Sequence, residues 1–165
     1  MYTLARVLPE GALTVEEGKP APDFKLTSDA GENVRLSDLK GKPVVVYFYP
    51  KDDTPGCTAQ ACGIRDNYEA FAERGAVVLG ISPDDESSHV KFKQKYGLPF
   101  TLLADPDHRV ADQYGVWGER SMYGKKYMGI ERSTFIVDPE GNVARIMRRM
   151  KPDTHAEQVL EALPS

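Results

Sequence analysis

Residues 44–57 read VVVYFYPKDDTPGC, and this stretch predicts a strand, a loop and the start of a helix. Val44–Tyr49 is β-branched and aromatic without polar alternation, which is typical of a strand buried on both faces. Pro50–Gly56 is rich in turn-forming residues. Cys57 then lies at a strand-to-helix connection, where α/β proteins concentrate function.

Glycines and prolines divide the rest of the chain into alternating strand-like and helix-like segments. Further strands are predicted at Val34–Leu36, Ala76–Ile81, Phe100–Leu103, Ser133–Val137 and Val143–Met147. Helices are predicted through Ile64, Tyr68, Phe71 and Ala72 as far as Gly75, and at Ser87–Tyr96, Val110–Tyr114 and Ala156–Leu163. Because strands alternate with helices and the last two strands form a hairpin, we expect an α/β fold with a mixed central β-sheet flanked by helices.

The length of 165 residues fits one domain, and 41% apolar with 28% charged residues is an ordinary globular composition. We expect residues 1–18 to form an N-terminal arm or hairpin and residues 19–165 to form the domain. The longest apolar runs, 44–49 and 75–81, are far shorter than the ~20 residues that span a bilayer. The N-terminus shows no signal-peptide pattern, so we expect a cytoplasmic protein.

The charge balance argues against nucleic-acid and membrane partners. There are 21 basic and 25 acidic side chains, a net charge of −4, so no global field attracts nucleic acid or an anionic membrane. His89, His108 and His155 lie far apart without metal-ligand spacing, and we expect them to be surface or capping residues. No metal, nucleotide or phosphate motif is present, so no cofactor is expected.

The two cysteines, Cys57 and Cys62, are too few for a disulfide framework or a zinc site built on sulfur. In a reducing compartment two close cysteines are more often catalytic or redox-sensing. Thr54 is a suitable N-cap and Pro55 a suitable first helical residue, which makes Cys57 the third. Free backbone N–H groups and the helix dipole favour a thiolate there. The alternative is that Cys57 is a small buried core residue.

Two acidic neighbours oppose a thiolate. Asp52 and Asp53 precede Cys57 closely, and nearby carboxylates disfavour a second negative charge. A cationic partner for the sulfur must therefore come from elsewhere in the fold. Gly56, directly before Cys57, leaves room for a small substrate to approach the backbone.

The loop carries a resemblance to a known family. Residues 50–57, Pro-Lys-Asp-Asp-Thr-Pro-Gly-Cys, resemble the peroxiredoxin signature Pro-x-x-x-Thr-x-x-Cys, and Cys57-Thr-Ala-Gln-Ala-Cys62 resembles the cysteine pair of the PrxQ or bacterioferritin-comigratory-protein branch. The similarity runs from about Ala21 to Leu163 and includes the stretch Arg132–Asp138, which reads RSTFIVD.

This resemblance implies a thioredoxin-like fold and thiol-dependent reduction of hydrogen peroxide and alkyl hydroperoxides. On it, Cys57 is the peroxidatic cysteine and Cys62 the resolving one. Pro50 shields the pocket, the Thr54 hydroxyl contacts the peroxide, and Arg132 supplies the required cation. The resemblance also implies that thioredoxin or a similar dithiol is the reductant; we expect a monomer.

Two other functions remain open. A thiol–disulfide oxidoreductase of the same fold uses Cys-x-x-Cys, whereas four residues separate the cysteines here, and Arg132 stands where that class has a cis-proline. A non-catalytic redox sensor would signal through Cys57. The late basic cluster, Arg145, Arg148, Arg149 and Lys151, is interpreted as a solvated strand edge, with a partner surface as the alternative.

The cysteine spacing also predicts a motion. If both cysteines lie on one regular helix, their Cα atoms are about 8.7 Å apart. A disulfide tolerates at most about 7 Å, so the segment from Gly56 to about Gly63 must unwind on oxidation. Gly63 favours this because glycine weakens a helix by up to ~1 kcal/mol relative to alanine. The alternative is a disulfide between two chains.

Overall fold

The computed structural model describes residues 15–163, apart from the side chain of Met122. The predicted N-terminal arm at residues 1–18 therefore lies mostly outside the described residues. Of its last part, Gly18 donates a backbone hydrogen bond to Val143 at 2.7 Å, and the neighbouring Pro20 pairs with Asn142. This segment thus runs along the last hairpin of the domain.

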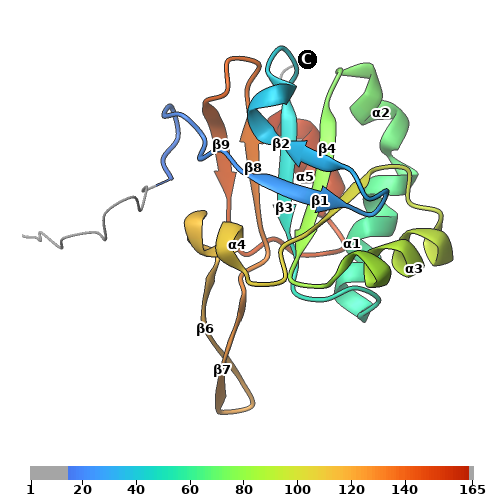
Figure 1. The fold of residues 1–165 in the computed structure, drawn as a ribbon, viewed down its shortest axis with the longest axis vertical. Coiled ribbons are helices and arrows are strands. Elements are labelled where there is room, and N and C mark those ends of the chain that lie inside the picture. The colour runs from blue at the N-terminus through green and yellow to red at the C-terminus, as the bar shows by residue number, and fades with distance from the viewer. Residues whose placement is uncertain (1–14, 164–165) are drawn as a thin grey trace, which may run out of the picture.

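A seven-stranded mixed sheet forms the centre of the molecule, in the order β2-β1-β5-β4-β3-β8-β9 (Figure 1). Its strands are β1 (Lys25–Ser28), β2 (Asn33–Arg35), β3 (Val44–Phe48), β4 (Val77–Ser82), β5 (Thr101–Ala104), β8 (Ser133–Val137) and β9 (Val143–Met147). β3, β4 and β5 are parallel, whereas β8 runs antiparallel to β3. The predicted α/β fold with a mixed central sheet is confirmed.

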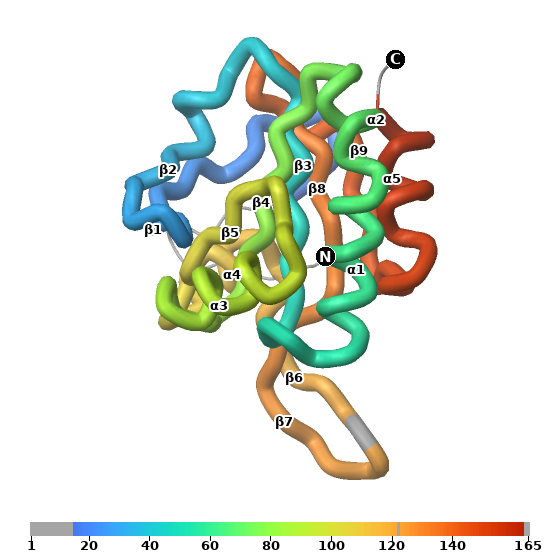
Figure 2. The backbone as a smooth tube through the Cα atoms, turned by 90° about the vertical axis from the view of Figure 1, so that its right-hand side faces the viewer, coloured from blue at the N-terminus to red at the C-terminus, as the bar shows by residue number. Residues whose placement is uncertain are grey.

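Helices cover both faces of this sheet. They are α1 (Pro55–Asp66), α2 (Tyr68–Glu73), α3 (Glu86–Tyr96), α4 (Arg109–Gln113), α5 (His155–Ala162) and the short 3₁₀ helix η1 (Leu36–Leu39). Val45 and Tyr47 of β3 pack into the core under α1, α2, α3 and α5, whereas Val46 and Phe48 pack into the core under η1 and α4. β3 is therefore buried on both faces, as its sequence predicts. Figure 2 shows α1, α2 and α5 together on one side of the sheet.

The prediction of one helix through Ile64 to Ala72 is wrong in one respect, because the helix is broken at Asn67. The Asn67 side-chain amide donates to the Gly63 carbonyl at 2.8 Å, and its backbone N–H bonds to Ile64. Such side-chain bonds compete with the helical backbone ladder and end α1 here. Gly75, with φ 68°, follows α2 as predicted.

A second small sheet was not predicted. β6 (Trp117–Met122) and β7 (Lys125–Ile130) pair only with each other and project from the body of the molecule (Figures 1 and 2). Tyr123 and Gly124 make the turn with φ of 52° and 79°. Tyr123 is 97% exposed, so the hairpin tip has no core contact that an apolar pattern could have indicated.

The expectation for the histidines is wrong at two of three positions. His89 and His155 are fully buried. His108 does precede α4, but its side chain accepts no capping bond; its ring stacks on Trp117 with centroids 3.8 Å apart. Burial of two histidines requires polar partners inside the fold, and both lie near the end of the sheet where α1 begins.

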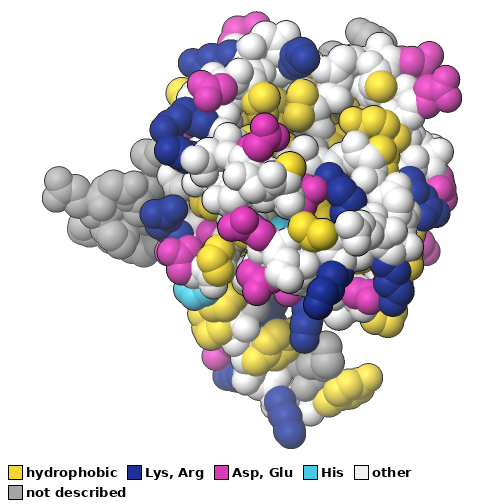
Figure 3. Space-filling view, turned by 45° about the vertical axis from the view of Figure 1, so that its right-hand side comes forward, with side chains coloured by type: hydrophobic (Ala, Val, Ile, Leu, Met, Phe, Trp, Pro, Cys, Tyr) yellow, Lys and Arg dark blue, Asp and Glu magenta, His cyan; other side chains and the backbone are white. Residues whose placement is uncertain are grey.

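The basic cluster lies on and after β9, the outermost strand of its side of the sheet. Arg145 and Lys151 are exposed, and Arg148 pairs with Glu131 at 3.1 Å. This agrees with a solvated strand edge. Figure 3 shows basic and acidic side chains intermixed over one face of the molecule rather than gathered by sign.

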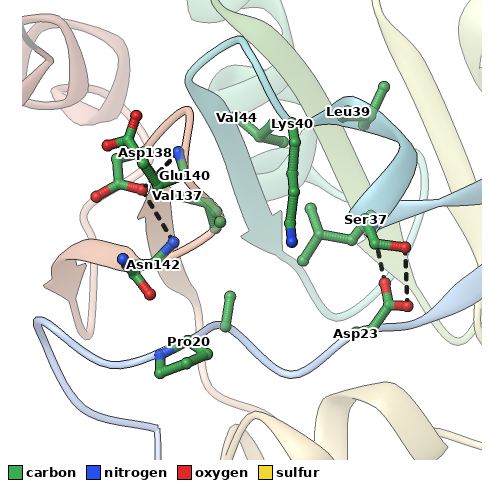
Figure 4. A pocket seen from close by; sticks show the side chains of 13 residues that line it. Pro20, Asp23, Ser37, Leu39, Lys40, Val44, Val137, Asp138, Glu140 and Asn142 are labelled. Atoms are coloured by element: carbon green, nitrogen blue, oxygen red, sulfur yellow. Dashed lines mark hydrogen bonds between the residues drawn. The ribbon is translucent and has the colours of Figure 1, made fainter.

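A pocket of about 210 Å³ opens at the end of the sheet opposite to Cys57 (Figure 4). Val44 and Val137, at the first residue of β3 and the last of β8, line it, together with Lys40. Ser37 closes one wall by donating two hydrogen bonds to Asp23, at 2.9 and 3.0 Å. Neither cysteine lines this pocket, so it lies apart from the thiol chemistry.

Within residues 15–163, no helix is both long and apolar enough to cross a membrane. The same residues hold no cluster of three or more histidine, cysteine or acidic side chains arranged to bind a metal ion.

Candidate active site

Cys57 is the third residue of α1 and is 2% exposed. Thr54 occupies the N-cap position with an extended backbone, and Pro55 is the first helical residue, as predicted. The predicted capping bond of Thr54 is absent, however, because its hydroxyl donates to the Lys51 carbonyl at 2.8 Å. Thr54 therefore leaves the N–H groups of the first turn free for an anionic group beside Cys57.

Arg132 brings a cation to this sulfur. Its Nη1 lies 3.5 Å from Cys57 Sγ. Arg132 immediately precedes β8, and β8 pairs with β3 so that Ser133 lies opposite Phe48. This register places the start of β8 beside the end of β3, from which the chain leads into α1. The backbone carbonyl of Arg132 also accepts a bond from Met150 at 2.8 Å, which fixes its position.

Gln60 is a site residue that the sequence analysis missed. It is fully buried, and its Oε1 accepts a hydrogen bond from Arg132 Nη1 at 2.6 Å. Gln60 follows Cys57 by three residues, so both side chains lie on one face of α1. The only feature of the sequence that could have indicated this role is a polar residue three positions after Cys57. Gln60 holds the guanidinium that faces the sulfur.

Cys62 lies on the same continuous helix and is half-buried, and both cysteines are free thiols. The condition of the spacing argument, that both cysteines lie on one regular helix, is met. Because α1 is regular from Pro55 to Asp66, the spacing argument applies without change. The two sulfurs cannot bond within this chain while the helix is intact.

Comparison with known proteins gives the family of this fold and site. Residues 17–146 match the AhpC/TSA family. Peroxiredoxin Bcp of Bacillus subtilis is 51% identical over 92% of this chain and 96% of its own, and that of Escherichia coli K12 is 46% identical over 90% and 96%.

Solved structures of related proteins indicate the same family. A mutant PrxQ of Xylella fastidiosa aligns with a TM-score of 0.86 at 33% identity, covering 92% of this chain and 96% of its own. The bacterioferritin comigratory protein of Xanthomonas campestris, studied for alkyl peroxide reduction, aligns with a TM-score of 0.80 at 40% identity over 85% and 89%. The chain is a Bcp/PrxQ peroxiredoxin of the AhpC/TSA family. It is therefore a thiol-dependent peroxidase with the predicted thioredoxin-like fold.

The acidic neighbours of Cys57 are paired in this peroxiredoxin. Asp53 accepts hydrogen bonds from Lys95 at 2.8 Å and from the Tyr96 hydroxyl at 2.6 Å, and these bonds lower the pKa of its carboxyl. Asp52 bonds to His89 at 2.7 Å. Each carboxylate thus has a cationic partner on α3, which offsets the repulsion that their sequence positions predict.

Pro50 and Thr54 flank the peroxiredoxin loop at its two ends. Pro50 directly follows the buried Tyr49 and is exposed, and Thr54 directly precedes α1. The Thr54 hydroxyl bonds within the loop rather than to a side chain of α1. Both residues belong to the short connection between β3 and α1 that leads to Cys57.

Four buried polar atoms, on β3, on α1, on α5 and at the residue before α5, have no hydrogen-bond partner among residues 15–163. These buried atoms are Tyr47 Oη, Gln60 Nε2, Thr154 Oγ1 and His155 Nδ1. His155 Nε2 pairs with the Thr134 hydroxyl at 2.6 Å. Burial, and then the charge of Arg132, lower the pKa of His155 to about 3, so this ring is neutral at physiological pH.

Tyr47 reaches this region because its partner on β4 is Gly80. A Cβ on Gly80 would lie 2.9 Å from the Tyr47 ring, so only glycine leaves room there. Burial raises the pKa of Tyr47 well above its usual value, and its hydroxyl stays protonated. Buried polar groups of this kind are the usual sites of ordered water in proteins.

Proposed function

We propose that Cys57 is the peroxidatic cysteine of this peroxidase and that Arg132 is the cation that stabilises its thiolate. The observation that carries this proposal is the 3.5 Å approach of Arg132 Nη1 to Cys57 Sγ at the N-terminus of α1. Cys62 is half-buried, and the nearby Arg65 donates its hydrogen bonds to Asp66 and to the Tyr96 carbonyl instead. These environments favour Cys57 as the nucleophile.

The chemistry follows from these groups. The Cys57 thiolate attacks one oxygen of the peroxide; the S–O bond forms while the O–O bond breaks. The second oxygen leaves as hydroxide or alkoxide and takes up a proton, and Cys57 becomes a sulfenic acid. The Arg132 guanidinium and the free N–H groups of α1 stabilise the charge that moves along this axis. The Thr54 hydroxyl, whose proton is bonded to the Lys51 carbonyl, accepts a hydrogen bond from the peroxide. Pro50 shields the pocket from water.

Hydrogen peroxide and alkyl hydroperoxides are the proposed substrates. The related protein of Xanthomonas campestris has alkyl peroxide reduction activity, which supports an organic hydroperoxide. Gly56 adjoins Cys57, and a Cβ there would lie 3.0 Å from Arg132 Nη2, so glycine keeps the approach to the sulfur open. Alanine at this position would displace the guanidinium.

Cys62 is the proposed resolving cysteine. Its thiol attacks the sulfenic sulfur, water leaves, and the Cys57–Cys62 disulfide forms within one chain. The first turns of α1, from Gly56 to about Gly63, unwind for this step. Thioredoxin or a similar dithiol then reduces the disulfide and is itself oxidised. A monomer is sufficient for this cycle, and dependence on dithiols fits the reducing cytoplasm.

Peroxide-dependent oxidation of thioredoxin, coupled to thioredoxin reductase, tests this assignment. Wild type should turn over, Cys57→Ser should be inactive, and Cys62→Ser should consume one equivalent of peroxide without turnover. A redox sensor would show no sustained turnover, and a thiol–disulfide oxidoreductase would exchange disulfides without consuming peroxide. Normal turnover of Cys62→Ser would refute the resolving role.

A further inference from the structure

A buried ion pair lies directly under the loop that precedes Cys57. Asp52 in this loop and His89 on α3 are both buried, and Asp52 Oδ2 lies 2.7 Å from His89 Nδ1. The proposed peroxidase chemistry uses neither side chain. Because isolated buried charges are strongly unfavourable, a pair retained here needs a reason beyond the packing of α3.

The contacts of His89 define its charge. Nδ1 faces the Asp52 carboxylate, and Nε2 lies 2.9 Å from the backbone carbonyl of Leu103. Both partners are acceptors, so both ring nitrogens carry a proton and the ring is an imidazolium. Burial opposes this charge, but the hydrogen bond and charge of Asp52 prevail and raise the pKa of His89.

Further hydrogen bonds hold Asp52 in position. Its carboxylate accepts from the Tyr49 hydroxyl at 2.6 Å and from the Ser88 hydroxyl at 2.8 Å. Its backbone N–H donates to Asp84 at 2.7 Å. These partners lie directly after β3, on α3 and in the connection between β4 and α3, so Asp52 is held by segments that do not include α1.

The loop is therefore bonded to the body of the protein at both Asp52 and Asp53, and it leads from there into α1. The Asp52 side chain is buried, and α1 begins three residues later, at Pro55, after Thr54. The first turns of α1 must open for Cys57 to reach Cys62. Opening that propagated back to Asp52 would separate a buried ion pair, which is strongly unfavourable.

We propose that Asp52 and His89 are positioning residues that anchor the Pro50–Thr54 loop to α3 throughout the catalytic cycle. The anchor holds Thr54 in position for the reaction with peroxide. It also makes Thr54 the point at which the unwinding of α1 stops. This inference rests on the proposed roles of Cys57 and Cys62. It assigns to the pair two effects: a faster reaction with peroxide and a sharp boundary of local unfolding.

Amide hydrogen exchange by NMR on the full chain, reduced and peroxide-oxidised, tests the boundary without any mutation. The Asp52 amide, bonded to Asp84, should stay protected in both states, whereas amides from Thr58 to Gly63 should exchange much faster after oxidation. Loss of protection at Asp52 on oxidation would overturn the anchor. If no Cys57–Cys62 disulfide forms, the proposed resolving step and this inference fail together.

Variants test the effect on catalysis. His89→Gln and Asp52→Asn should slow the reaction with peroxide by about 10- to 100-fold, because Thr54 is no longer held in register. Reduction of the preformed disulfide by dithiothreitol should not change. Lys91→Gln is the control: it removes the charge of an exposed lysine of α3, two residues after His89, and should change the peroxide rate by less than about twofold.

Amide exchange at Asp52 in the reduced His89→Gln variant distinguishes loss of the anchor from a general loss of stability. The anchor requires faster exchange there while the amides of β3 and β4 keep their protection. Equal acceleration across the sheet, or an unchanged peroxide rate in both loop-pair variants, would contradict the proposal.

Discussion

The Arg132 guanidinium lies 3.5 Å from the Cys57 sulfur, although 75 positions separate the two residues in the sequence. The antiparallel pairing of β8 with β3 creates this approach, because it brings the start of β8 to the end of β3 that leads into α1. A fixed charge beside the N-terminus of a helix is an environment that stabilises a thiolate. The relationship depends on sheet register, and no local sequence pattern contains it.

Replacement of Arg132 should slow the first chemical step. Arg132→Ala should lower the second-order rate constant for peroxide by about 10²-fold, since a preorganised donor to the transition state is lost. Arg132→Lys should be intermediate because lysine keeps the charge without the planar fork. Stopped-flow measurement on Cys62→Ser isolates this step. Arg145→Ala, an exposed arginine of β9, is the control, and an equal loss there would remove Arg132 from the site.

Gln60 should act through Arg132. Gln60→Ala removes the 2.6 Å acceptor and should slow the reaction with peroxide by about tenfold. Gln60→Glu restores an acceptor oxygen but adds a negative charge near the sulfur, so it should stay slower than wild type. The same stopped-flow assay provides the comparison. Equal rates for Gln60→Ala and wild type would show that Arg132 needs no support from α1.

Gly63 should set how easily α1 opens. A Cβ there would lie 3.8 Å from Ala156, an ordinary contact, so Gly63→Ala fits the fold. It should stabilise α1 by up to about 1 kcal/mol and slow disulfide formation by about fivefold. The reaction with peroxide should not change. Rapid-quench trapping of the thiols, followed by mass spectrometry, measures the second step.

The exposed Ala59, one turn before Gly63 on α1, allows the opposite change. Ala59→Gly should speed disulfide formation. Gly63→Ala should also accumulate more sulfinic acid on Cys57 at high peroxide, because the sulfenic acid persists longer. If both variants close the disulfide at the wild-type rate, helix opening does not limit this step.

His155 should make the fold less stable as the pH falls. Its pKa is lowered to about 3 by burial, whereas in the unfolded chain it is about 6.5. Between these values the unfolded state binds a proton that the folded state does not, so stability decreases by up to about 1.4 kcal/mol per pH unit. Urea unfolding from pH 7 to 4 should show a smaller decrease for His155→Gln. If the free energy of unfolding fell equally with pH in wild type and His155→Gln, the buried ring of His155 would not be neutral.

His89 should act in the opposite direction. Because its pKa is raised in the folded protein, its contribution is complete below the unfolded pKa of about 6.5 and is lost as the pH rises through the folded value. Unfolding curves from pH 6 to 9 should fall less steeply for His89→Gln than for wild type. His108→Gln is the control because His108 is partly exposed. A steeper fall in His89→Gln would exclude the imidazolium.

Local features were predicted well because their causes are local. Thr54 and Pro55 mark the start of α1 whatever the rest of the chain does, and this placed Cys57 at its third position. β3 was predicted from an uninterrupted apolar run. Features made by long-range contacts were not predictable: without the family resemblance, Arg132 could not be distinguished from Arg120 or Arg145.

The errors have the same physical origin. The burial of His89 depends on Asp52 and on the Leu103 carbonyl, which only the folded sheet brings together. β6 and β7 pair with each other and expose most of β7, so no alternation of apolar residues marks them. The break at Asn67 comes from one side-chain bond, which the helical spacing of the apolar residues did not show.

Intact-mass analysis after one equivalent of peroxide tests the central claim most directly, with wild type, Cys57→Ser and Cys62→Ser compared on non-reducing gels. The account predicts that wild type loses two hydrogens and stays a single chain, that Cys62→Ser gains one oxygen on Cys57, and that Cys57→Ser does not react at a comparable rate. Oxygen found on Cys62, or a wild-type disulfide that joins two chains, would contradict it.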